Sequence, residues 1–367
     1  MNILYITNHL NAGGITSYVL SLAGGLKEKG HNVYLASRGG ELLPKFVESG
    51  IIFLPIPIKT KSELSPRILF SRAKLAPVLR EKGIDIIHSH SRTTQVLAHL
   101  LSRNSSVRHV FTCHGFFKRR LFRQLFPCWG SKVIAISQQV REHLIQDFRL
   151  DAKKIIVIHN GIDLNRFAQG PGEDKAVFKR RLGLNGGPVV GIVARLSDVK
   201  GHTYLIQAMK SVLGKFPDAQ LLIVGEGKMH QGLVALSRKL GIAQHVFFIP
   251  TINHTSRALR AMDLFVMPSL KEGLGLALME AMASGLAVVG SNVGGIKSLI
   301  RDQDNGLLVE PADAAQLSEA IISLLGDLKL MSCLGAKARI FINENFSKDK
   351  MVLETERVYL RCLEETG

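Results

Sequence analysis

The first 37 residues contain three segments whose order decides the fold class: ILYIT (residues 3–7), SYVLSLAGGLKE (17–28) and NVYLA (32–36). The first and third are short runs typical of β-strands. The middle one has apolar residues at helical spacing and is closed by Lys29-Gly30. A strand, a helix and a second strand at these spacings fit a right-handed crossover between parallel strands. This stretch therefore predicts an α/β protein with a doubly wound sheet.

The same alternation runs through the whole chain and restarts once. Strand candidates separated by helical patterns continue to His159, a polar stretch with Gly and Pro follows at residues 169–174, and strand candidates resume at Val189. We expect two Rossmann-like domains, over residues 1–165 and 166–346. In doubly wound sheets the carboxyl ends of the strands meet the helix N-termini, so we expect a ligand in a cleft between two such domains.

The charge of the chain is concentrated in its first half. Lys and Arg number 47 against 30 Asp and Glu, a formal net charge of +17. Residues 1–160 hold 23 basic and 9 acidic residues (+14), and residues 161–367 hold 24 and 21 (+3). A uniformly basic nucleic-acid binder would not obviously confine its charge to one half, although a single basic domain could do so; we expect no nucleic-acid partner.

Hydropathy, the N-terminal sequence and the cysteines indicate where in the cell we expect the protein. No apolar run reaches the roughly 18 residues of a spanning helix, and the N-terminus lacks a signal-peptide pattern. Four scattered cysteines without a C-x-x-C pair favour reduced thiols over a disulfide framework or a zinc site. We expect a cytoplasmic protein, with a peripheral position on the cytoplasmic face of the inner membrane as an open alternative.

The densest basic stretch is residues 116–126. Projected as a helix, it has an aromatic and aliphatic arc opposite a basic arc. Such a helix suits an anionic membrane surface, but it equally suits an ordinary surface helix packed on its own sheet. Both interpretations stay open. The basic residues concerned are Lys118, Arg119, Arg120 and Arg123.

Two cations share one loop of the second half. Arg195 and Lys200 lie between the strand candidate that begins at Val189 and the following helix. A guanidinium fork and an ammonium near a helix N-terminus would neutralise a diphosphate, although two solvated loop cations would look the same in sequence.

The most informative passage is MPSLKEGLGLALMEAMASG, residues 267–285. Glu272 lies in a glycine-rich loop directly after a strand, followed by Gly273, Leu274 and Gly275. Eight residues on, Glu280 interrupts an otherwise apolar helix. Burying a carboxylate is costly unless it accepts hydrogen bonds, and sugar hydroxyls are suitable donors. The alternative for Glu280 is the exposed side of its helix.

Glycines follow three other strand candidates. Gly13-Gly14, Gly225-Glu226-Gly227 and Gly294-Gly295 could each let backbone N–H groups approach an anion, or could form plain turns. None is a G-x-G-x-x-G motif, which argues against a dinucleotide-binding dehydrogenase.

Histidines and acidic residues complete the candidates. His88, His90 and His114 end strand candidates, where side chains in a doubly wound domain point towards the ligand. Asp302 and Asp304 form a D-x-D sequence followed by an Asn-Gly turn signal, so we expect a solvated turn and no metal there.

Together these motifs resemble the retaining GT-B glycosyltransferases of family 4, the group 1 type, over nearly the whole chain. The E-x7-E pair with the upstream Arg and Lys is the specific part. Leu274 replaces the usual Phe and Ala194 the usual Gly. The matching motifs are Gly13-Gly14, His88-Ser89-His90, His114-Gly115, Ala135-Ile136-Ser137, Asn160-Gly161-Ile162-Asp163, Arg195 with Lys200-Gly201, Gly225-Glu226-Gly227, Glu272 with Glu280, and Gly294-Gly295.

The resemblance implies a role for each of these residues. Arg195 and Lys200 would hold the donor diphosphate, Glu272 the donor-sugar hydroxyls and Glu280 the nucleotide ribose, while His114 and Gly14 would face the donor from the first domain. Such enzymes use no divalent metal or cofactor, and their last helix, here about residues 347–367, returns to the first domain.

The function we expect is therefore the transfer of a hexose-type unit from a nucleotide diphosphate sugar, UDP-linked by preference, to a lipid-linked, lipopolysaccharide or other glycan acceptor with retention. The alternatives are a nucleotide-sugar epimerase of GT-B-like fold and a basic, non-enzymatic membrane or nucleic-acid binder.

Overall fold

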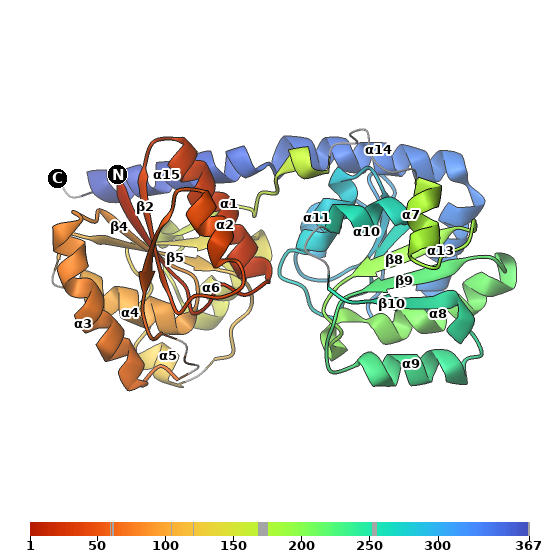
Figure 1. The fold of residues 1–367 in the computed structure, drawn as a ribbon, viewed down its shortest axis with the longest axis horizontal. Helices are drawn as coiled ribbons and strands as arrows, with labels where there is room; N and C mark the ends of the chain where they lie inside the picture. The colour runs from red at the N-terminus through yellow and green to blue at the C-terminus, as the bar shows by residue number, and fades with distance from the viewer. Residues whose placement is uncertain are drawn as a thin grey trace. The chain divides into compact units, whose positions relative to one another are not determined.

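The structure is a computed structural model that describes residues 1–365 apart from 59, 61, 104, 120, 168–174 and 252–254, and only the backbone of 121 and 122. It consists of two compact units (Figure 1). Unit 1 comprises Met1–Gly161 and Lys348–Gly367, and unit 2 comprises Ile162–Ser347. The division falls slightly before the expected boundary at residue 165.

Unit 1 is built on a seven-stranded parallel sheet of order β3-β2-β1-β4-β5-β6-β7. The strands are β1 (Asn2–Ile6), β2 (Asn32–Ser37), β3 (Ile52–Pro55), β4 (Ile86–Ser89), β5 (Arg108–Cys113), β6 (Lys132–Ala135) and β7 (Ile155–Val157). The helices are α1 (Gly14–Glu28), α2 (Leu43–Glu48), α3 (Pro66–Glu81), α4 (Arg92–Ser102), α5 (Leu121–Leu125), α6 (Gln138–Phe148) and α15 (Lys348–Glu364), with a 3-10 turn at Ala152–Lys154.

Helices cover both faces of this sheet, as Figure 1 shows. Successive side chains of β1 point to opposite faces. Ile3 and Tyr5 pack in one apolar layer with α1 and α15, and Leu4 and Ile6 pack in the other with α3 and α4. Burial on both faces explains why the strands are largely apolar instead of alternating between apolar and polar residues.

The C-terminal helix α15 packs against α1 at a glycine. A Cβ atom on Gly25 would lie 2.5 Å from Cγ2 of Val352, whereas one on Gly24 would meet no atom within 4 Å. Gly25 thus permits the close approach of two helices that lie more than 300 residues apart in sequence.

Unit 2 has a six-stranded parallel sheet of order β10-β9-β8-β11-β12-β13. The strands are β8 (Val189–Val193), β9 (Gln220–Val224), β10 (Val246–Ile249), β11 (Leu264–Met267), β12 (Ala287–Ser291) and β13 (Leu307–Val309). The helices are α7 (Lys175–Arg181), α8 (His202–Lys215), α9 (His230–Lys239), α10 (Thr255–Ala261), α11 (Leu276–Ala283), α12 (Ile296–Leu299), α13 (Ala314–Gly326) and α14 (Leu328–Asn345), with 3-10 turns at Leu164–Arg166, Asp198–Lys200 and Ala243–His245.

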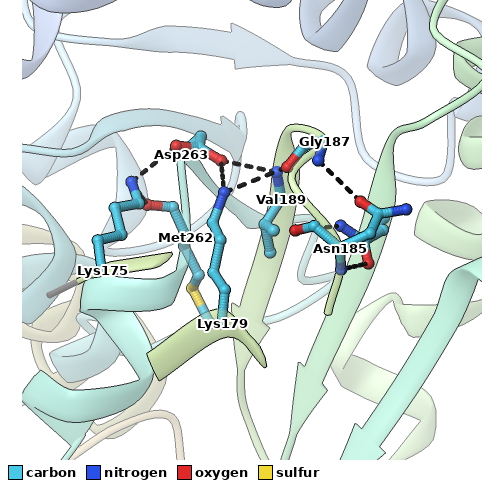
Figure 2. Close-up of polar contacts among 8 residues, drawn as sticks. Lys175, Lys179, Asn185, Gly187, Val189, Met262 and Asp263 are labelled. Carbon is cyan, nitrogen blue, oxygen red and sulfur yellow. Dashed lines mark hydrogen bonds and ion pairs between the residues drawn. The ribbon is translucent and has the colours of Figure 1, made fainter. Parts of the chain in front are cut away.

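An ion-pair cluster ties α7 to the amino-terminal edge of this sheet, as Figure 2 shows. Asp263 accepts hydrogen bonds from Nζ of Lys175 (2.7 Å), Nζ of Lys179 (2.8 Å) and the Val189 N–H (2.8 Å). Burial raises the pKa of Asp263, but these donors outweigh it and the net pKa is lowered. The cluster therefore fixes α7 where β8 and β11 begin.

Each sheet has one point at which the strand order reverses, between β1 and β4 in unit 1 and between β8 and β11 in unit 2. Ligands of doubly wound sheets bind at the carboxyl edge next to this point, because the loops diverge there. The candidate site residues at these edges lie in the loops that follow β1, β4, β8 and β11.

The two connections between the units run side by side. The Ile162 N–H donates to the Phe346 carbonyl at 3.0 Å, and Ile162 bridges Ser347 in parallel. Among the described residues, no helix is both long and apolar enough to cross a membrane.

The prediction of a helix over residues 116–126 is wrong. Only Leu121–Leu125 is helical, and residues 116–119 are irregular. Arg123, expected on a solvated basic arc, is 7% exposed, with its guanidinium 4.1 Å above the Phe117 ring, while Leu125 is 73% exposed. An arginine's planar, weakly hydrated head can be buried against an aromatic ring, which a helical projection ignores.

Candidate functional site

The loop after β8 presents its two cations, Arg195 and Lys200, differently. Arg195 is exposed, and none of the described residues forms an ion pair or hydrogen bond with its side chain. Lys200 ends a 3-10 turn, and the next residue, Gly201, has φ +71 and caps α8. A Cβ atom on Gly201 would lie 1.8 Å from the Pro268 carbonyl oxygen, so only glycine fits. This contact holds the loop after β8 against the loop after β11.

Lys200 and Glu272 meet where these loops touch. Nζ of Lys200 forms a hydrogen-bonded ion pair with Oε2 of Glu272, and Oε1 of Glu272 accepts from the Gly273 N–H at 3.2 Å. The two side chains are 20% and 13% exposed. A cation and a carboxylate are thus held together at the switch point of unit 2.

The glycine pair after β12 supports Glu272 from behind. The Gly295 N–H donates to the Glu272 carbonyl at 3.1 Å, and a Cβ atom on Gly294 would lie 2.0 Å from the same oxygen. We expected this pair to offer N–H groups to an anion, but the Gly295 N–H is already used by the protein. Close packing against Glu272 is the reason for glycine here.

Gly225 and Gly227 likewise allow close backbone packing, here against the loop that contains Arg195. Their Cβ atoms would lie 2.1 Å and 2.2 Å from the Ala194 and Leu196 carbonyl oxygens. Glu226, between them, accepts from the Leu196 N–H at 2.9 Å through its backbone, and its side chain is exposed. The close backbone approach of this motif is therefore to the Arg195 loop.

Glu280 lies within α11 and is partly buried. Burial raises its pKa, and the neighbouring Thr255 hydroxyl and the charge of Arg166 act in the opposite direction. The interpretation as a freely solvated helix face is therefore excluded. Leu274 is 2% exposed, and Gly275, with φ +91, caps the helix.

In unit 1, His90 and His114 follow β4 and β5 and form a pair. Nδ1 of His90 lies 3.1 Å from Nε2 of His114. Burial lowers the pKa of His114 to about 3 and that of His90 well below its usual value. Both rings are therefore neutral at physiological pH.

His88, which we expected to point towards a ligand, lies instead in a buried polar network beside this pair. His88 is fully buried, with Nδ1 2.6 Å from the Tyr359 hydroxyl and Nε2 2.7 Å from that of Thr112. The Tyr359 hydroxyl also lies 2.9 Å from that of Tyr5. Tyr359 belongs to α15, and no local pattern indicates a contact that spans 271 residues.

Gly13 and Gly14 begin α1 at the carboxyl end of β1. Both are exposed, α1 starts at Gly14, and a Cβ atom on Gly13 would meet nothing within 4 Å. The free N–H groups of this helix end can therefore be approached from solvent.

The basic surface predicted near residue 120 is smaller than expected. Lys118 and Arg119 are exposed, and Arg119 lies 3.9 Å from Asp147. Arg123 is buried, and Arg120 lies outside the described residues. Contact with an anionic membrane stays a prediction, for which cosedimentation of a Lys118→Glu/Arg119→Glu variant with anionic vesicles is the test.

The D-x-D sequence forms the expected turn. The Gln303 N–H donates to the Gly306 carbonyl at 2.8 Å, Asp302 accepts from the Leu308 N–H at 2.8 Å, and Asp304 pairs with Lys337. In the part of the chain that the structure describes, no group of three or more His, Cys, Asp or Glu side chains could hold a metal ion. Cys113, Cys128 and Cys362 are buried free thiols, and Cys333 is an exposed one.

Comparisons with known proteins agree with this layout. The model for glycosyl transferases group 1 matches residues 174–341, and the model for glycosyltransferase family 4 matches residues 12–166. An uncharacterized glycosyltransferase of Methanocaldococcus jannaschii is 27% identical over 97% of this chain and 96% of its own. A UDP-Gal:alpha-D-GlcNAc-diphosphoundecaprenol alpha-1,3-galactosyltransferase of Escherichia coli is 29% identical over 79% of both chains.

Solved structures show the same fold. A glycosyltransferase from Rickettsia africae superposes with a TM-score of 0.88 at 22% identity, covering 100% of this chain and 99% of that one. Anabaena HepE in complex with UDP-glucose superposes with a TM-score of 0.86 at 22% identity, covering 98% and 99%. The fold is thus GT-B, with two Rossmann-like domains, as predicted. Since the two family models together match nearly the whole chain, this protein belongs to the family 4 glycosyltransferases, the group 1 type.

Proposed function

We propose that this glycosyltransferase moves a hexose-type unit from a UDP-linked sugar to a lipid-linked or other glycan acceptor, with retention and without a divalent metal. The observation that carries the proposal is the Lys200–Glu272 pair at the switch point of unit 2, with Arg195 exposed in the same loop as Lys200.

The two charges of the pair suit the two halves of such a donor. A lysine ammonium and a guanidinium fork neutralise a diphosphate, and a carboxylate accepts hydrogen bonds from sugar hydroxyls. In the structure, Lys200 and Glu272 satisfy each other. Both side chains are therefore held close to their working positions before the donor arrives, which reduces the ordering cost of binding.

Glu280 would bind the nucleotide ribose. Its partly buried carboxylate is costly in an apolar helix, and two ribose hydroxyls would offset that cost as hydrogen-bond donors. The choice of UDP rests on likeness: HepE was solved with UDP-glucose, and the E. coli relative is named for UDP-Gal.

The names of two relatives and the positive charge of residues 1–160 both support a lipid-linked acceptor. The E. coli relative is named for a diphosphoundecaprenol acceptor, and a Mycolicibacterium smegmatis relative, 29% identical over 89% of this chain and 84% of its own, is a phosphatidyl-myo-inositol mannosyltransferase. Residues 1–160 carry a charge of +14. An anionic, lipid-linked acceptor bound by unit 1 fits this distribution.

Chemistry would rest on charge stabilisation of the leaving nucleoside diphosphate. Arg195 and Lys200 supply two cations, and His114 and the N-terminus at Gly14 supply N–H donors. In the path we propose, the departing phosphate removes the acceptor proton on the same face of the sugar, so no protein nucleophile is needed and the anomeric configuration is retained.

A ligand screen tests the donor assignment. We expect UDP-sugars, and not GDP- or ADP-sugars, to raise the melting temperature of the wild type. Glu272→Ala and Lys200→Ala should each abolish most transfer, whereas Lys215→Ala, an exposed lysine at the other end of α8, should retain it. Undiminished transfer by both site variants would contradict the assignment.

Three further outcomes test the rest of the proposal. The product anomer, read by NMR, should match that of the donor, and excess EDTA should leave the rate unchanged. Isomerisation of the donor sugar in the absence of any acceptor would instead identify an epimerase.

A further inference from the structure

The His90–His114 hydrogen bond links the protonation of two neutral rings. A neutral imidazole has one N–H donor and one lone pair. In the 3.1 Å contact between Nδ1 of His90 and Nε2 of His114, one ring must donate and the other must accept. The tautomer of one ring therefore determines the tautomer of the other.

Neighbouring rings fix the orientation of His90. Its ring stacks on Tyr5 at 5.6 Å with an interplanar angle of 13°, lies 4.3 Å from the His88 ring and meets the edge of Tyr18 at 5.7 Å. The residue is 2% exposed. Enclosed in this way, His90 cannot turn Nδ1 away from His114 without disturbing the core.

The other nitrogen of His90 decides between the two arrangements. Nε2 is buried and has no hydrogen-bond partner among the described residues. If His114 donated, this nitrogen would carry a buried N–H without an acceptor. If His90 donates through Nδ1, its Nε2 atom carries only an unused lone pair. Buried N–H groups without partners are rarer than underused acceptors, so His90 is the donor.

We propose that His90 is a positioning residue that holds His114 as the Nδ1–H tautomer, so that His114 presents an N–H donor at the carboxyl end of β5. His114 is partly exposed, and none of the described residues bonds to its Nδ1. The use of this donor rests on the proposed function: it would bind negative charge that develops on the leaving diphosphate. Being neutral, His114 could do this without a proton-transfer step.

Two substitutions of His90 distinguish a role in setting the tautomer of His114 from a role in core packing. In His90→Asn the side-chain amide can place an N–H where Nδ1 was, and it can still donate to His114. In His90→Leu the volume is kept and the donor is lost. His109→Leu is the matched control, because His109 is also buried and bonded, to Ser89 at 2.8 Å, but no ring or hydrogen-bond contact joins it to His114 in the described structure.

The direct readout is a nitrogen-15 spectrum of the histidine rings, in which protonated and unprotonated nitrogens are well separated. The His114 signals are assigned by their loss in His114→Asn. We expect the Nδ1–H form in the wild type, in His90→Asn and in His109→Leu, and a shift towards Nε2–H in His90→Leu. An Nε2–H form in the wild type, or no change in His90→Leu, would overturn the proposal.

Kinetics provide the second readout. For His90→Leu we expect kcat to fall by about 10- to 100-fold with little change in the KM of the donor, and His90→Asn to restore most of it. Equal losses in both variants, in step with their melting temperatures, would show a purely structural role. Because the spectrum needs no substrate, failure of the proposed function and failure of this inference are distinguishable.

Discussion

Glu280 carries a stability penalty that its proposed ligand would relieve. Burial raises its pKa, so the folded state disfavours the carboxylate, and this penalty is present in full above the folded pKa. We predict that Glu280→Gln raises the melting temperature at pH 7 and weakens UDP binding by about 10-fold or more. The stability gain should shrink as the pH falls through the folded pKa and be lost below the ordinary value of 4.5. Thermal scans from pH 4 to 8 and calorimetric titration with UDP measure both effects, and a less stable variant with unchanged affinity would contradict them.

Arg123 provides a second prediction at this scale. Its guanidinium lies over Phe117 and 5.9 Å from the Phe148 ring centre, whereas Arg119 is 55% exposed. Arg123→Ala should lower the free energy of unfolding by about 1–2 kcal/mol, and Arg119→Ala by less than about 0.5 kcal/mol. Urea denaturation of the two variants compares them directly. Equal effects would mean that Arg123 does not anchor this segment.

Glu280 and Arg123 show when the burial of a single side chain can be predicted from sequence and when it cannot. The partial burial of Glu280 was predictable because the rest of its helix is apolar, whereas its role as a ligand stays a prediction. Arg123 was misplaced because the projection assumed a helix that residues 116–119 do not form. The Tyr359–His88 contact was invisible, since it depends on how α15 packs and not on local spacing.

Among the elements, α1 offers a matched pair of glycines. Gly25→Ala would place a Cβ atom 2.5 Å from Val352, so α15 must shift, at a cost of about 1–3 kcal/mol. Gly24→Ala meets open space and should stabilise the helix by about 0.5–1 kcal/mol. Chemical denaturation measures both. The packing account fails if the two substitutions have the same sign.

The attachment of α7 gives a pH-dependent prediction. The folded-state pKa of Asp263 is lowered, so its contribution to stability is complete above the ordinary value of 3.8 and is lost as the pH falls through the folded pKa. Asp263→Asn should destabilise unit 2 by about 1–3 kcal/mol at pH 7, and this difference should diminish below pH 4. Melting curves at several pH values measure it. A difference that persists unchanged in acid would exclude an electrostatic origin.

Element positions were largely predictable from sequence for one physical reason. Strands buried on both faces read as short apolar runs bounded by Gly, Asn or Asp. The strands predicted at residues 3–7 and 32–36 agree with β1 and β2 to within one residue, and β8 begins at Val189 as predicted. The glycines were recognised, but the partner of each was not. Gly225, Gly227, Gly294 and Gly295 pack against protein backbone, and this close approach is a tertiary fact that spacing does not contain.

For the whole molecule, the two-unit division predicts how a shortened chain behaves. The last helix supplies Val358, Tyr359 and Cys362 to the core of unit 1. A chain that ends at Ser347 should lose the unfolding transition of unit 1 and keep that of unit 2, together with UDP binding. Calorimetry with and without UDP separates the two transitions. Retention of both transitions would show that α15 is dispensable.

The contact between Gly25 and Val352 also has a consequence for synthesis. Unit 2 is continuous in the chain, whereas unit 1 needs its first and last segments together. A ribosome makes about 5–20 residues each second, so the early part of unit 1 must wait some tens of seconds for α15. Unit 2, although second in the sequence, is the first to be complete, and the apolar surface of α1 and β1 stays uncovered until the last helix leaves the exit tunnel.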